Sequence, residues 1–366
     1  MPTLPQSQLA AACASIAAVA ANSINMGQAF LSADGVNFTI RATDQINWLT
    51  LTIPCTQVME SIQINAAKLA EIVNSIRTPD VTLSVVEGAL VLKSKSGKRT
   101  LKASPSPYPA PTDFDAPVVS LSAGRLLEAV AFCEPAIPAD GGNKPEREGL
   151  YLHSHDGTYR AVSFSGTLLH IFDVTRGTED FGLTIASRTL SLLKKALPKD
   201  ADLEMRTNNH RVSFKWDGGE LIGAAIDMQF PKYLAYLERL AKPAGLLAVR
   251  GPEFIGAARS VISVGLEDKG VGSKKVRLHL KSEVSLHAQS QSGEGEEMAD
   301  AEWVGPEFAI SFASRLLEAG MSGFGDDELS VGISPLPVEF NAPPAPMIVR
   351  SIKRKDRVSY ITPLRS

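Results

Sequence analysis

Stretches of alternating apolar and polar residues recur along this chain, and each follows a stretch with apolar residues at helical spacing. Strict alternation predicts strands with one buried face, and spacing of three to four predicts amphipathic helices. Three such strands contain Leu83, Leu203 and Leu329, which lie 120 and 126 residues apart. A second alternating strand is expected after each, across turns at Glu87-Gly88, Asn208-Asn209 and Pro335.

A helix is expected just before each of these strands. The three segments are NAAKLAEIVNSIR (65–77), IASRTLSLLKKAL (185–197) and FASRLLEAG (312–320). Their alignment places Lys68, Arg188 and Arg315 at one position. Asn65, Ser187 and Ser314 suit helix starts, because their side chains can accept hydrogen bonds from free backbone N–H groups.

Another helix is expected at the opening of each repeat, over 7–21, 122–133 and 251–264, with Leu9, Leu126 and Phe254 equivalent. A hairpin follows the first two. Asp34-Gly35 and Asp156-Gly157 stand between alternating strands, which is a strong hairpin signal.

These repeats predict an α+β protein of three similar domains, each with two helices and β-sheets. Proline-rich connectors near 107–117 and 241–245 place the domains at 1–117, 118–242 and 243–366. The period is too long for a solenoid of short repeats.

Composition limits the classes of protein that remain. Hydrophobic residues make up 44% and charged residues 21% of the chain, which is ordinary for a soluble protein, and no apolar run is long enough for a membrane span. The alanine-rich segment 9–21 lacks a preceding basic residue, so it is interpreted as a helix and not as a signal peptide. Three separated cysteines argue against a disulfide framework or a zinc site and suit a reducing cytoplasm. With a net charge of −3, any DNA-binding charge must be gathered on one face.

Three motifs, in this order of domains, resemble those of the bacterial DNA polymerase III beta subunit, the sliding clamp. They are DGTYRAVSFSGTLL (156–169), FPKY (230–233) and the ending YITPLRS (360–366). The resemblance covers the whole chain. Ser165, Thr167 and Leu168 stand where that family has Asp, His and Arg, so the resemblance is to a divergent member.

The resemblance implies a head-to-tail homodimeric ring of six domains, with helices lining a central hole around duplex DNA. Such a ring tethers a DNA polymerase and performs no chemistry itself. Basic side chains on or beside the inner helices would then attract phosphates without reading sequence. They are Lys68, Arg77, Arg125, Arg188, Lys194, Lys195, Lys199 and Arg315. The first helix would contribute a neutral stretch, because it has no charge between Ser7 and Asn22.

The resemblance also implies a groove that binds a short hydrophobic peptide of a polymerase, a clamp loader or a repair factor. Leu168 and Ala235 replace arginines of the family pattern, so a less cationic groove is expected. The groove residues carried over are Phe164, Gly166, Thr167, Leu169, Pro231, Ala235, Tyr236, Tyr360, Ile361, Thr362, Pro363, Leu364 and Arg365.

The subunit interface, on the same basis, would pair a strand near Arg99 and Leu101 with a partner helix carrying Arg259, Ile262 and Val264. A strand edge that pairs across subunits is no longer open to aggregation.

Two alternatives remain at this point. One is an accessory or mobile-element clamp with other partners, and the other is a β-rich ligand-binding protein or enzyme. His153 and His155 alternate on one strand face, but no third ligand lies near them in sequence; no metal, cofactor or catalytic residue is expected. SFSGT lacks the glycine that a nucleophile elbow requires before its serine.

Overall fold

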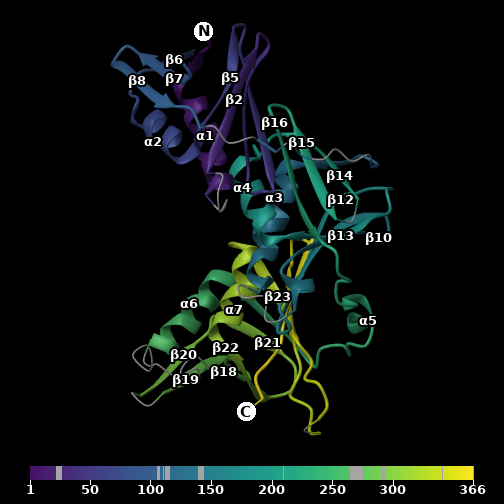
Figure 1. The fold of residues 1–366 in the computed structure, drawn as a ribbon. Helices are drawn as coiled ribbons and strands as arrows, with labels where there is room; N and C mark the ends of the chain where they lie inside the picture. The colour runs from purple at the N-terminus through teal and green to yellow at the C-terminus, as the bar shows by residue number, and fades with distance from the viewer. Residues whose placement is uncertain are drawn as a thin grey trace. The chain divides into compact units, whose positions relative to one another are not determined.

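The computed structural model describes residues 1–21, 27–104, 108–109, 111, 116–138, 144–208, 210–263, 275–290, 293–339 and 341–365. It contains two compact units (Figure 1). Unit 1 comprises Met1–Leu127 and Leu183–Asp227, and unit 2 comprises Glu128–Gly182 and Met228–Ser366. None of the helices within the described residues is both long and apolar enough to cross a membrane.

Unit 1 contains helices α1 (Gln6–Ala20), α2 (Ala66–Ser75) and α4 (Ser187–Ala196), and the first residues of α3 (Ala123–Cys133). Helix α1 packs against both α2 and α4. The strands of unit 1 are β1 (Thr3–Pro5), β2 (Gln28–Asp34), β3 (Asn37–Thr43), β4 (Trp48–Pro54), β5 (Val58–Asn65), β6 (Asp80–Val86), β7 (Ala89–Ser94), β8 (Gly97–Lys102), β9 (Val119–Ser122), β13 (Gly182–Ala186), β14 (Asp202–Thr207), β15 (Arg211–Trp216) and β16 (Gly219–Ile226).

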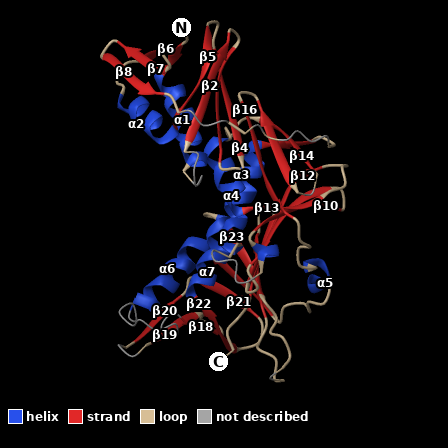
Figure 2. Cartoon of the chain, in the orientation of Figure 1, coloured by secondary structure: helices blue, strands red, loops and turns tan. Residues whose placement is uncertain are grey.

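Unit 2 contains the short helix α5 (Tyr233–Leu237) and helices α6 (Gly251–Ile262) and α7 (Ser314–Met321). Figure 2 shows α6 and α7 beside one another next to strands of this unit, and both helices contact those strands. The strands are β10 (Gly149–His155), β11 (Thr158–Phe164), β12 (Leu168–Arg176), β17 (Gly245–Arg250), β18 (Lys275–Leu280), β19 (Ser285–Gln289), β20 (Glu294–Met298), β21 (Ala301–Val304), β22 (Phe308–Ala313), β23 (Glu328–Ile333), β24 (Met347–Ser351) and β25 (Arg357–Ile361).

One pairing pattern occurs three times. Four antiparallel strands follow one another in the orders β1-β6-β7-β8, β9-β14-β15-β16 and β17-β23-β24-β25. Each set is accompanied by a three-stranded meander, β2-β3-β4, β10-β11-β12 or β18-β19-β20. Leu83, Leu203 and Leu329 occupy equivalent strands of the four-stranded sets and are at most 1% exposed. The expected repetition of elements is therefore present.

Helix starts show where alignment by sequence fails. Asn65 caps α2, with its Oδ1 accepting a hydrogen bond from the Lys68 N–H at 2.9 Å. In α4 and α7 the extended capping residues are Ala186 and Ala313, so the two predicted serines are the first helical residues. Lys68 is thus the third residue of its helix, whereas Arg188 and Arg315 are the second of theirs, and the aligned position is wrong by one residue.

The predicted hairpins are confirmed at Asp34-Gly35, where Gly35 has φ of 91°, and at two turns in which both central residues have positive φ. Glu87-Gly88 and Asp156-Gly157 have φ values of 50° and 72°, and of 49° and 70°. Asn209 lies outside the described residues. The strand expected directly after Pro335 is wrong: the described part of 334–346 contains no strand, and β24 begins at Met347. Proline supplies no N–H for a ladder, which opposes a strand there.

Candidate functional sites

The C-terminal strand forms one side of an apolar cluster in unit 2. Strand β25 pairs antiparallel with β12, with Leu169 opposite Tyr360 and Ile171 opposite Val358. Alternation along the strands turns these four side chains to one face. The cluster on this face consists of Val162, Leu169, Ile171, Phe230, Tyr233, Ile348 and Tyr360.

Several predicted groove residues come together here. Leu169 and Tyr360 belong to the cluster, and Phe164 packs against it. Tyr236 is 39% exposed, and its pKa is raised first by burial and then by the nearby Tyr360. The Thr362 N–H donates to the Thr167 carbonyl oxygen at 2.8 Å, which joins the tail to the loop before β12.

At Gly166, in the loop before β12, the backbone lies close to the Arg147 side chain. Gly166 has φ of +100°, and a Cβ on it would lie 3.0 Å from the Arg147 guanidinium. That guanidinium lies 4.8 Å from the centre of the Phe164 ring. A side chain at this position would therefore be strained and would press on Arg147.

The position of Ile361 contradicts the prediction that this residue lines the groove. It is fully buried on the opposite sheet face, where a Cβ on Gly320 of α7 would lie 2.3 Å from its Cδ1. Ile361 is therefore a core residue beneath α7 and does not line the groove. The cause is alternation, which gives Tyr360 and Ile361 opposite faces.

The other predicted tail residues hold the chain end in place. Pro363 is buried, and Leu364 is half-buried with its N–H donating to the Ser311 carbonyl oxygen at 2.7 Å. Arg365 donates to the Ala342 carbonyl oxygen. The Pro231 carbonyl accepts from the Tyr233 N–H at 2.6 Å at the start of α5, which also carries the half-buried Ala235.

A cavity of about 400 Å³ lies beside this cluster. Ile171, Leu237, Val358 and Tyr360 form its apolar part. Its basic lining residues are Arg160, Arg350, Arg354, Lys355 and Arg357, against the acidic Asp173 and Asp356. Tyr360 is the one predicted groove residue among those lining this cavity, so the expectation of a less cationic groove stays a prediction. Alternation in β25 could have identified Val358, but nothing local in the sequence brings Arg350 or Lys355 to it.

A buried arginine holds the strand that carries Tyr360. Arg357 is 4% exposed, and its guanidinium forms ion pairs with Glu128 and Asp356. It also lies 4.6 Å from the Phe172 ring centre and 5.6 Å from that of Phe132. Burial acts to lower the pKa of Arg357, but the two carboxylates outweigh it and the pKa is raised.

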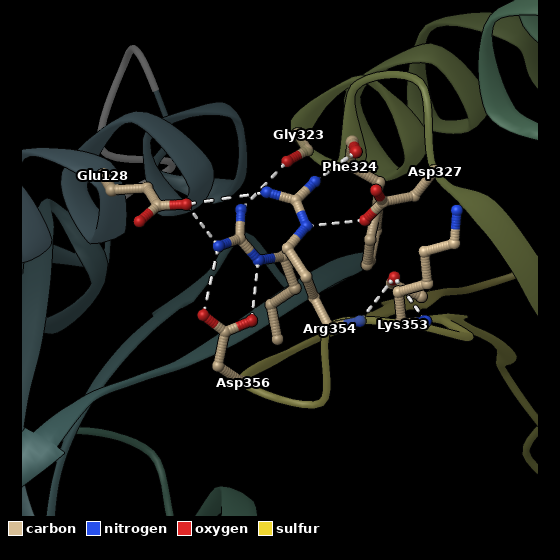
Figure 3. Close-up of polar contacts among 9 residues, drawn as sticks. Glu128, Gly323, Phe324, Asp327, Lys353, Arg354 and Asp356 are labelled. Atoms are coloured by element: carbon tan, nitrogen blue, oxygen red, sulfur yellow. Dashed lines mark hydrogen bonds and ion pairs between the residues drawn. The ribbon is translucent and has the colours of Figure 1, made fainter.

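Arg354 extends the same network from the loop between β24 and β25 (Figure 3). Its Nε lies 2.6 Å from Asp327 Oδ2, its Nη1 lies 3.6 Å from Glu128, and its Nη2 donates to the Phe324 carbonyl oxygen. The loop is therefore fixed from both ends, at Arg354 and at Arg357.

A second polar chain borders the cluster. His153 Nε2 lies 2.8 Å from the Tyr233 hydroxyl, and the Arg160 Nε donates to Asp173 at 2.7 Å. Burial lowers the pKa of His153 to about 4, so its imidazole is neutral at pH 7. His155 instead lies 3.4 Å from Asp156. Across the residues described, no three His, Cys, Asp or Glu side chains are grouped so as to hold a metal ion.

The predicted helix charges divide into two groups. Arg188 is committed to unit 1: it donates to the Ala18 carbonyl oxygen at 2.7 Å and lies 3.4 Å from Asp44. Arg125 is half-buried. The remaining side chains are exposed on or near their helices: Lys68, Arg77, Lys194, Lys195, Lys199 and Arg315.

The predicted interface strand β8 is an edge strand, since it pairs with β7 alone among the described strands. Its sequence GKRTLK carries Lys98, Arg99 and Lys102, while Leu101 is buried. Arg259 on α6 is exposed and pairs with Glu318, Ile262 is half-buried, and Val264 lies outside the described residues.

A complementary edge was missed in the sequence. Strand β20 pairs with β19 alone among the described strands, and its sequence EGEEM carries Glu294, Glu296 and Glu297. Glu297 Oε2 accepts from Ser260 of α6 at 3.0 Å, and Glu296 Oε1 lies 2.9 Å from His287. The run of glutamates was the available signal, but glutamate is uncommon in strands.

The repeated helices, meanders and four-stranded sets define the sliding clamp fold. Solved structures with this fold are similar to the chain over its whole length. The DNA polymerase III beta subunit of Thermotoga maritima matches 100% of this chain and 99% of its own, with 17% identity and a TM-score of 0.87. The Pseudomonas aeruginosa clamp bound to griselimycin has 17% identity to this chain and a TM-score of 0.88. The Bacillus subtilis clamp has 16% identity and a TM-score of 0.86. Both matches cover 100% of this chain and 99% of the other chain. At the level of sequence, no protein-family model and no curated protein matches the chain.

Proposed function

We propose that this protein is a DNA sliding clamp, a homodimeric ring of six domains that encircles duplex DNA and tethers a DNA polymerase. The observation that carries the proposal is the clamp fold over the whole chain. The mechanism is topological and uses no catalytic residue: a closed ring cannot leave a duplex sideways, and a bound polymerase stays at high effective concentration.

The strand pairing supports ring closure. Within each unit, the third meander strand pairs antiparallel with the last strand of the next four-stranded set, β4 with β16 and β12 with β25. By the same rule, β20 of one chain would pair with β8 of the partner chain. Both strands have an open edge within the described part of the chain. A head-to-tail dimer satisfies this rule twice, and it pairs the open edges of β8 and β20. The repeated strand pairing also supports three domains, at 1–117, 118–242 and 243–366.

Opposite charges on these edges support the same pairing. Lys98 and Arg99 of β8 would meet Glu296 and Glu297 of the partner's β20, and opposite charges across strands stabilise a pair. Arg259 and Ile262 of α6 would lie near this seam, since α6 contacts β20.

The proposal is tested by retention on circular DNA. The protein is assembled around a nicked plasmid by dilution from high salt and isolated by gel filtration, and the plasmid is then cut once. We expect the protein to co-elute with the circle and to be lost after linearisation. Equal retention on both forms would contradict a topological link, and retention on neither would contradict encirclement itself.

Exposed helix charges should set the salt dependence of DNA binding. Replacing Lys68, Lys195 and Arg315 with Ala should reduce the slope of log K against log salt by about 0.9 for each phosphate that is no longer neutralised. Arg188→Gln is the matched control: it removes a charge engaged with Asp44, so it should destabilise unit 1 and leave the slope unchanged. Anisotropy of a labelled duplex over 20–200 mM salt, roughly the range used for such slopes, measures both. An unchanged slope in the triple variant would remove these residues from the DNA-facing surface.

The cavity beside Tyr360 supports the predicted peptide groove for a polymerase, a clamp loader or a repair factor. Its apolar side chains offer area for an anchor, and edge-bound peptides commonly combine such anchors with backbone hydrogen bonds. An accessory or mobile-element clamp remains the second candidate, favoured by Leu168 and by the altered loop at Ser165 and Thr167.

A further inference from the structure

The outward face of the β18-β19-β20 meander carries a stripe of basic side chains along one strand. Lys275, Arg277 and His279 alternate along β18, so their side chains lie on one face, while the intervening Val276 and Leu278 are fully buried. Among the described residues, neither Lys275 nor Arg277 forms an ion pair with a carboxylate. This cationic stripe therefore has two charges available to a ligand.

A second imidazole extends the cationic stripe onto the middle strand. His287 on β19 is directly opposite Arg277, and its ring centre lies 4.3 Å from that of His279. The pKa of His279 is lowered, first by burial and then by His287, Arg277 and Lys281. Glu296 acts in the opposite direction and is outweighed. The surroundings of His279 thus carry an excess of positive charge, which a bound anion would offset.

The carboxylates of this face lie two strands away from the cationic stripe. Glu294 and Glu296 are on β20, and about 10 Å separates β18 from β20 across β19, since neighbouring strands lie about 4.8 Å apart. Glu296 is already engaged, because its Oε1 lies 2.9 Å from His287 Nε2. Salt screens charges over about 8–10 Å. The two glutamates therefore weaken the attraction for an anion at β18 without cancelling it.

The same face forms a cavity of about 630 Å³, which both imidazoles and the two unpaired cations line. Small-molecule sites commonly have volumes of about 300–1,000 Å³. Successive cations of the stripe are about 7 Å apart along β18, since a strand rises about 3.3 Å per residue. An anion that contacts several of them must carry several charged groups. Phosphate suits this requirement, because a terminal phosphate carries about −1.5 to −2 at pH 7 and matches the arginine fork.

We propose that this cavity binds a small polyphosphate anion, the diphosphate or triphosphate chain of a free polyphosphate or of a nucleotide. Its phosphates contact Lys275, Arg277 and the pair of imidazoles at His279 and His287. The site lies within one chain and does not depend on ring closure, so its test is separate from that of the proposed clamp function.

Inorganic triphosphate is the probe, and the chain is isotope-labelled at the Cε1 atoms of its six histidines for NMR. We expect the signals of His279 and His287, assigned from the His279→Gln and His287→Gln variants, to shift with triphosphate concentration at low salt. His210 is the internal control, because its side chain is 69% exposed beside Asp227 and does not line the cavity. Its signal should stay unchanged.

The pKa of His279, read from the same signal, should rise when triphosphate is bound, because phosphate favours the charged imidazole. The titratable and charged groups that face this imidazole are His287, Arg277, Lys281 and Glu296, and the residue opposite it on β22 is the uncharged Ala309. An unchanged or lowered pKa of His279 in the presence of saturating triphosphate would overturn the proposed contact.

Lys275→Gln with Arg277→Gln should weaken triphosphate binding by about tenfold or more, as expected for the loss of two charge-assisted contacts. Lys242→Gln with Lys353→Gln is the matched control, because it removes two exposed charges of unit 2 that lie outside the cavity lining. The control should bind as the unaltered protein does, and circular dichroism confirms that each variant is folded.

A titration with a nucleoside triphosphate separates the two sources of the anion. Tighter binding than that of inorganic triphosphate assigns the site to a nucleotide, and equal or weaker binding assigns it to free polyphosphate; both results support the phosphate site. Unchanged signals of His279 and His287 at millimolar triphosphate would overturn it. Equal weakening in the control variant would show attraction to net charge alone and would overturn the assigned residues.

Discussion

Reversing two charges on the β8 edge should convert the ring into single chains. Lys98→Glu with Arg99→Glu would place like charges opposite Glu296 and Glu297 of the partner's β20 at both seams of the proposed dimer. Like charges juxtaposed in an interface cost several kcal/mol, which corresponds to about a hundredfold or greater loss in dimer affinity. Light scattering after gel filtration at micromolar concentration should then give the 39.1 kDa mass of one chain.

The complementary variant makes this test specific. Glu296→Lys with Glu297→Lys should also be a single chain, but mixing it with the β8 variant should restore a two-chain species, because each seam then pairs opposite charges. A chain with both sets of changes should dimerise alone. Lys93→Glu with Lys95→Glu is the control: it alters charge equally on the neighbouring exposed surface and should remain a dimer. A mixture that stays monomeric would contradict the pairing of β8 with β20.

Arg357→Met should destabilise unit 2 by about 2–4 kcal/mol, because removing one partner of a buried ion pair leaves the other charge without compensation. Asp356 and Glu128 are 25% and 38% exposed at their side chains, so water can recover part of the loss. Packing on the Phe132 and Phe172 rings is removed as well. Hydrogen exchange in β12 and β25 measures the effect locally, which is preferable in a chain of two units.

The Arg354→Met variant tests whether the burial of Arg357, and not its charge alone, determines the loss of stability. Arg354 pairs with the same Glu128 and with Asp327, but its side chain is 39% exposed. Its replacement should cost no more than about 1 kcal/mol, the usual limit for an exposed pair. Equal effects of the two variants would show that burial of the Arg357 guanidinium does not govern the stability of this strand.

The repeat could be predicted because it is a local property of the chain. Alternation around Leu83, Leu203 and Leu329, and helical spacing around Leu9, Leu126 and Phe254, each follow from burying one face of an element. The Asp-Gly and Glu-Gly turns are local for the same reason. The strand expected after Pro335 failed because alternation alone does not supply the backbone donors that a ladder needs.

The sites could be predicted only in part. Tyr360, Leu169 and Phe164 were placed together by motif, yet Ile361, which was predicted to line the same groove, is fully buried on the opposite face. Lys68 and Arg188 were treated alike, although Arg188 is engaged by Asp44, more than a hundred residues earlier in the chain. The sequence gives the charge of a side chain. Whether that charge is free to bind a ligand depends on the residues that pack beside it.

The sequence by itself determined the repeated elements, the opposite charges of GKRTLK and EGEEM, and the neutral first helix, since these depend on residues near one another in the chain. Only the tertiary structure decided that β8 and β20 are edges, that Arg357 is buried, and that Arg350 and Lys355 border the cavity beside Tyr360. Those features arise from antiparallel pairing of strands far apart in sequence, such as β12 with β25, and the strand partner is set by global packing.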